Sequence, residues 1–84
     1  MTLPVPIAAD APGAPPRRNG ELVFDAPWEA RAFGLCIAVL EREQLGWDDF
    51  RPFLVAEIEA APERPYYESL AVALEAFVGH RSLA

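Results

Sequence analysis

The chain has 84 residues, of which 52% are apolar, and its thirteen acidic and seven basic residues give a net charge of −6. A chain of this length forms one small domain, and the apolar fraction excludes wholesale disorder. The acidic balance argues against a nucleic-acid partner, because no basic face could offset the surrounding acids. The apolar run 32–40 is too short to cross a membrane, and no secretory leader opens the sequence. We therefore expect a cytoplasmic protein with no membrane partner.

The sequence offers little for catalysis by this chain alone. Cys36 and His80 are the only cysteine and the only histidine, which excludes an internal disulfide and the ligand cluster of a structural zinc site. We expect Cys36 to be a small core residue and not a reactive thiolate, and His80 to be a helix-end residue and not a general base. The prediction is a chain that binds no metal or cofactor and is not catalytic alone.

Residues 1–20 hold five of the nine prolines and two of the five glycines. Proline fixes the backbone angle φ and removes a hydrogen-bond donor, so this composition predicts an extended, mobile, Pro-rich arm. The arm is either a disordered tail or a segment that wraps a partner. Residues 21–84 remain for the fold.

The stretch "VFDAPWEARAFGL" predicts the start of a first helix, over residues 27–44. Pro27 suits a first turn, where the N–H groups have no partner within the helix. Asp25 is placed to cap those N–H groups, and Glu29 adds a second acid at the positive end of the helix. Phe24 is expected to pack one turn inside, on Trp28 or Ala30.

Two further helices follow, over residues 47–60 and 66–80. Gly46 is expected to cap the end of the first helix, and Pro52 to allow a kink in the second. Apolar residues at helical spacing predict the core face of each helix. These are Phe33, Cys36, Ile37 and Leu40, then Trp47, Phe50, Leu54 and Ile58, and finally Tyr67, Leu70, Leu74, Phe77 and Val78. The predicted fold is all-α, a small three-helix domain behind the N-terminal arm.

Arg51 and the pair Tyr66–Tyr67 stand apart from this pattern. Arg51 follows Phe50 by one residue, so it points away from the core face, and spacing alone indicates a surface arginine. Two adjacent tyrosines cannot both face one core, so at least one hydroxyl is directed outward or to a partner.

Four strings in this order, "NGELVFDAPWEARAFGL", "LGWDDFR", "AEI" and "YYESLAVALEAF", resemble a known family. The pattern is similar to nitrile hydratase accessory proteins and to the N-terminal helical half of nitrile hydratase β subunits. The resemblance covers residues 15–84. The first two strings at this separation, followed by "YYE", make it fairly specific.

The resemblance implies a partner chain and roles for six residues. In the family, an α subunit carries iron or cobalt on a cysteine claw with two oxidised cysteines, and a β-type chain packs against it. Arg51 matches an arginine that hydrogen-bonds the oxidised sulfur oxygens, which suits a guanidinium fork. Tyr66 matches a tyrosine near the substrate pocket. The remaining residues are expected to bind the partner: Trp28, Arg31, Phe33 and Tyr67.

Three functions stay open at this point. The first is an accessory protein that binds the α subunit and supports its maturation, through metal loading and cysteine oxidation. The second is a permanent small β-like subunit of a multi-chain nitrile hydratase that hydrates a nitrile to an amide, either with or without a further β-type chain. The third is an unrelated helical interaction module. Because the opening segment and C-terminal barrel of β subunits have no counterpart in the 84 residues, we expect the accessory role.

Overall fold

The structure, a computed structural model, describes residues 13–18 and 21–82 and has three helices preceded by a small antiparallel ribbon. The ribbon pairs β1 (Arg17–Arg18) with β2 (Glu21–Leu22). The helices are α1 (Pro27–Arg42), α2 (Trp47–Ala60) and α3 (Tyr66–Ser82). The all-α prediction is confirmed, and the ribbon is an addition to it. Within the described ranges, no helix is long and apolar enough to span a membrane.

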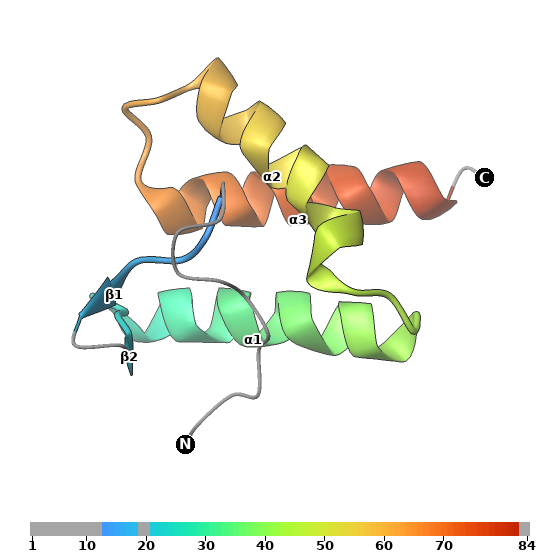
Figure 1. Cartoon of the computed structure of the whole chain (residues 1–84), viewed down its shortest axis with the longest axis horizontal. Helices are drawn as coiled ribbons and strands as arrows, with labels where there is room; N and C mark the ends of the chain where they lie inside the picture. The colour runs from blue at the N-terminus through green and yellow to red at the C-terminus, as the bar shows by residue number, and fades with distance from the viewer. Residues whose placement is uncertain (1–12, 19–20, 83–84) are drawn as a thin grey trace.

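The three helices pack as two layers around one core. In Figure 1, α1 and α3 lie side by side and run in the same direction, while α2 returns obliquely across α3 from the end of α1. The ribbon lies beside the N-terminal end of α1. Short connections of a few residues join the helices, as is usual in helical bundles.

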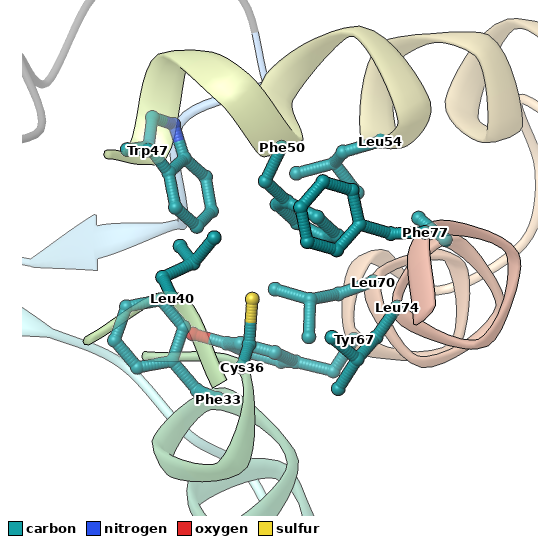
Figure 2. Packing of buried hydrophobic residues seen from close by; sticks show 11 residues of the cluster. Phe33, Cys36, Leu40, Trp47, Phe50, Leu54, Tyr67, Leu70, Leu74 and Phe77 are labelled. Carbon is teal, nitrogen blue, oxygen red and sulfur yellow. The ribbon is translucent and has the colours of Figure 1, made fainter. Parts of the chain in front are cut away.

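The core draws side chains from all three helices. Figure 2 shows Phe33 and Cys36 of α1 directed toward the aromatic residues of α2 and the apolar side of α3. Ring centroids lie 6.2 Å apart between Phe33 and Trp47 and 5.6 Å apart between Phe50 and Phe77, distances typical of aromatic pairs. The buried apolar residues are Phe33, Cys36, Leu40, Trp47, Phe50, Leu54, Tyr67, Leu70, Ala73, Leu74 and Phe77.

The predicted core positions hold with three differences. Ile37 and Ile58 are only half-buried, at the margin of the core. Val78 was expected to face inward and is instead 41% exposed. The physical reason is geometric: Phe77 takes the inward position, and the next residue is turned by about 100° around the helix axis.

The start of α1 is capped by a different acid from the one predicted. The residue before the helix is Ala26, which has no polar side chain, and the Glu29 carboxylate accepts from the N–H groups of Asp25 and Ala26. Asp25 is therefore a donor to the cap and not the cap itself. Phe24, which was expected to pack on Trp28 or Ala30, pairs its ring with those of Phe33 and Tyr67, at centroid distances of 5.9 and 5.2 Å.

The end of α1 is closed by a glutamine. Gln44 has the left-handed φ of 57°, the Leu45 N–H donates to the Leu40 carbonyl at 2.8 Å, and the Gln44 N–H donates to the Glu41 carbonyl. This pair of bonds is a Schellman motif. Gly46, the predicted cap of this end, instead caps the start of α2, where its N–H donates to the Asp49 carboxylate at 2.8 Å. The helix α2 then continues through Pro52 to Ala60.

Replacing Gln44 with glycine is expected to stabilise the chain by ~0.5–1 kcal/mol. The left-handed conformation costs a non-glycine residue ~1–2 kcal/mol, and glycine offsets only part of this gain through its greater freedom in the unfolded chain. A higher urea midpoint for Gln44→Gly, with no gain for Gln44→Ala, is the expected result. A lower midpoint for Gln44→Gly would mean that the glutamine side chain stabilises the turn.

Candidate functional site

Arg51 lies one turn inside α2, with its guanidinium on the surface of the helix. Its Nη1 is 3.0 Å from a carboxylate oxygen of Asp48, one turn earlier, and the two side chains are 34% and 80% exposed. An ion pair this exposed contributes ~0.2–1 kcal/mol, because water screens it. The guanidinium is thus held in place by a partner that a stronger anion can replace.

The aliphatic stem of Arg51 lies beneath the chain that precedes α1, residues 13–18 and 21–26, which we call the N-terminal segment. A Cβ placed at Gly13 would lie 3.7 Å from Arg51 Cγ and 3.3 Å from Val55 Cγ2, and Gly13 has a φ of +78°, which favours glycine. Pro15, two residues later, is buried. The prediction of a free arm over residues 1–20 therefore does not hold for residues 13–18: Gly13 lies against α2, Pro15 is buried, and Arg17–Arg18 pair with β2. Residues 1–12 and 19–20 lie outside the described residues.

Tyr66 and Tyr67, at the start of α3, both donate to backbone carbonyls of the N-terminal segment. The Tyr66 hydroxyl is 2.6 Å from the Gly13 carbonyl, and the Tyr67 hydroxyl is 3.0 Å from the Val23 carbonyl. Burial, with nearby Glu29 and Asp25 adding to it, raises the pKa of Tyr67 to about 12. Burial also raises the pKa of Tyr66, well above its usual range. Both hydroxyls are therefore neutral donors at physiological pH.

The four residues expected to bind a partner separate into two groups. Trp28, which is 41% exposed, and Arg31 lie on the solvent side of α1. Phe33 is fully buried and Tyr67 is 4% exposed. In this conformation Phe33 and Tyr67 offer almost no surface to a partner, because Phe33 shares the core stripe of α1 with Cys36 and Leu40.

A polar cluster that the sequence did not predict joins α2 to α3. Arg64, in the turn between them, donates through Nε to the Ser69 hydroxyl at 3.0 Å and through Nη2 to the carbonyl and carboxylate of Glu57. Ser69 is fully buried, so this bond satisfies its hydroxyl. The cluster fixes the angle between the helices that carry Arg51 and Tyr66.

Two observations bear on metal binding by the residues that the structure describes. Burial raises the pKa of the Cys36 thiol to about 12, so the free thiol is protonated at physiological pH. Among the described residues, no group of three His, Cys, Asp or Glu side chains is placed to hold a metal.

The described residues form a small three-helix module in which Arg51 of α2 is partly exposed, while the hydroxyls of Tyr66 and Tyr67, at the start of α3, bond to the chain that precedes α1. The sequence model of the family described as "Nitrile hydratase beta subunit, N-terminal" matches residues 9–83 of the chain. The chain therefore belongs to this family. Searches of curated proteins and of solved structures give no match.

Proposed function

We propose that the chain docks on the metal-carrying α-type chain of a nitrile hydratase and directs Arg51 at the oxidised cysteine oxygens of that chain. The observation that carries the proposal is the partly exposed guanidinium of Arg51, held on α2 by an exposed carboxylate. Membership of the β-subunit family supports the same partner.

The chemistry of Arg51 suits this role. A guanidinium presents several N–H donors in a fixed plane and matches paired anionic oxygens better than an ammonium group does. The bond to Asp48 is weak because both side chains are wetted. The cysteine oxygens of a docked partner are shielded from water, so they would replace Asp48 as the partner of Arg51. Arg51 would then hold the metal's cysteine ligands in position.

Two roles are compatible with this docking. Family membership favours a β-type subunit, in which Arg51 and Tyr66 stay at the site where a nitrile is hydrated to an amide. The metal, cobalt or iron, would belong to the partner α-type chain, and a further β-type chain would complete the enzyme.

The second role is an accessory protein for maturation of the α-type chain. The observation that favours it is the closed core, because Phe33 and Tyr67, both expected at a partner interface, are buried by other side chains within the described part of this chain. A chain that folds alone can bind and leave, as metal loading and cysteine oxidation of another chain would require.

The test is coexpression of this chain with candidate α-type and β-type chains. The α-type chain is isolated with and without this chain, and its metal content, cysteine oxidation and nitrile-hydrating activity are measured. A requirement for this chain during expression alone indicates an accessory role, whereas a requirement during turnover indicates a subunit. An α-type chain that matures and acts equally well without it rejects both.

Trp28→Ala is expected to weaken binding to the α-type chain ~30-fold or more while changing the free energy of unfolding little. A partly exposed tryptophan at an interface is a common hot spot, and 41% of Trp28 is available to a partner. Calorimetric titration gives the affinity and thermal unfolding gives the stability. If the helices melt while binding of the folded fraction persists, Trp28 serves the fold alone.

A further inference from the structure

Residues 13–18 form a strap across the helices that carry the candidate site. At one end, Gly13 lies against Arg51, Leu54 and Val55 of α2, and the following Pro15 is buried. At the other end, β1 pairs with β2, and the Val23 N–H donates to the Pro16 carbonyl at 3.1 Å. In Figure 1 this segment descends from the start of α3 to the ribbon beside α1.

A hydrogen bond from the Tyr66 hydroxyl holds this strap in place. It donates to the Gly13 carbonyl at 2.6 Å, across 53 positions of the sequence. A neutral hydrogen bond of this kind has a small net effect on stability, because water replaces it when it breaks. The closed strap is therefore stable enough to be the main state of the free chain and weak enough for a partner to displace.

We propose that the strap is a self-capping contact, closed in the free chain and released when the chain docks on the α-type chain. This inference rests on the docking function proposed above. While the strap is closed, Gly13 covers the stem of Arg51 and its carbonyl occupies the Tyr66 hydroxyl. Release frees both side chains toward the partner at the same time.

A self-cap lowers the apparent affinity for the partner. Only the open fraction of the chain is competent to bind, so the apparent dissociation constant is the intrinsic one divided by that fraction. Any change that loosens the strap without touching the docking surface must then tighten binding. This direction is opposite to the loss expected when a residue that merely stabilises the fold is changed.

Two variants loosen the strap from opposite sides. Tyr66→Phe removes the hydroxyl that bonds to the Gly13 carbonyl and keeps the ring. Gly13→Ala leaves Tyr66 intact. It puts a non-glycine residue in a left-handed backbone conformation and its methyl group 3.3 Å from Val55 Cγ2. Gly79→Ala is the matched control, because a Cβ on this exposed glycine of α3 meets no atom within 4 Å.

Two measurements on the full chain test the inference. Hydrogen exchange of the Val23 amide, followed by NMR, reports opening of the strap, and calorimetric titration gives the affinity for the α-type chain. We expect both variants to speed exchange, and we expect Gly13→Ala, which leaves the docking side chains intact, to tighten binding three- to tenfold, with no change for Gly79→Ala.

Three results would overturn the inference. Unchanged exchange in both variants would mean that Tyr66 and Gly13 do not hold the strap. Faster exchange with unchanged or weaker binding in the Gly13→Ala variant would mean that the strap does not obstruct docking. If the wild-type chain itself does not bind the α-type chain, the proposed function fails and the inference fails with it, whatever the exchange rates.

Discussion

Phe33→Ala is expected to lower the free energy of unfolding of the chain by ~3–5 kcal/mol, a large share of its stability. Phe33 is fully buried and packs on Phe24 of the N-terminal segment and on Trp47 of α2. Truncating such a ring removes the apolar burial and leaves a cavity. A domain of this size has only ~0.05–0.15 kcal/mol of stability per residue. Urea unfolding followed by circular dichroism measures the change.

Leu35→Ala is the control for Phe33→Ala. Leu35 lies two residues further along α1 and is 58% exposed, so its loss should change the free energy of unfolding by less than ~1 kcal/mol. A Phe33→Ala chain that keeps its stability and loses only its affinity for the α-type chain would contradict the packing and restore Phe33 as a partner contact.

Arg51→Lys is expected to lower the nitrile-hydrating activity of the assembled enzyme, or the metal content of the α-type chain, 10- to 100-fold. Losses of this size are typical when a side chain that orients metal ligands is changed. Lysine keeps the charge and the bond to Asp48 within reach but lacks the planar fork. Because the Asp48 pair is exposed, the free energy of unfolding should change by less than ~0.5 kcal/mol.

The matched control for Arg51→Lys is Arg42→Lys, an exposed arginine in the last turn of α1. This variant should keep full activity and metal content. If Arg51→Lys also keeps both, Arg51 does not contact the oxidised cysteines. If both variants lose activity equally, the effect comes from a general need for arginine on this surface and not from the fork of Arg51.

The helix starts could be predicted because their signals are local. Pro27 in a first turn, Asp48 and Asp49 after Gly46, and Tyr66 directly after Pro65 each mark a start within a few residues, and all three predicted starts agree with the structure. The predicted end at residue 44 was two residues too late. A left-handed glutamine closes α1, and no glycine signals that turn.

The strap could not be predicted because its contacts are far apart in the sequence. Five prolines in residues 1–20 indicated an arm without structure of its own, yet prolines also suit a segment whose carbonyls accept from side chains elsewhere. The bond between Tyr66 and Gly13 and the burial of Pro15 depend on how α2 and α3 meet. The hydrogen bonds of Arg64, which join α2 to α3, could not be predicted either, because they follow no helical spacing in the sequence.

For the candidate site, the sequence indicated which residues to examine, but it did not predict how far each side chain is buried. Spacing alone placed Arg51 on the surface, and the structure agrees, with its stem covered and its guanidinium partly exposed. Resemblance to a family assigned Trp28 and Phe33 to one docking surface, although five positions on a helix turn by about 500°, well away from one common face. The structure separates them into an exposed and a buried residue.

The most direct test of docking is the native mass of the complex formed when this chain is coexpressed with its candidate α-type and β-type chains. We expect one copy of this chain per α-type chain, retained in the active enzyme if it is a subunit and present only with metal-poor α-type chain if it is an accessory protein. Absence of any complex with the α-type chain, loaded or unloaded with metal, would contradict the central proposal.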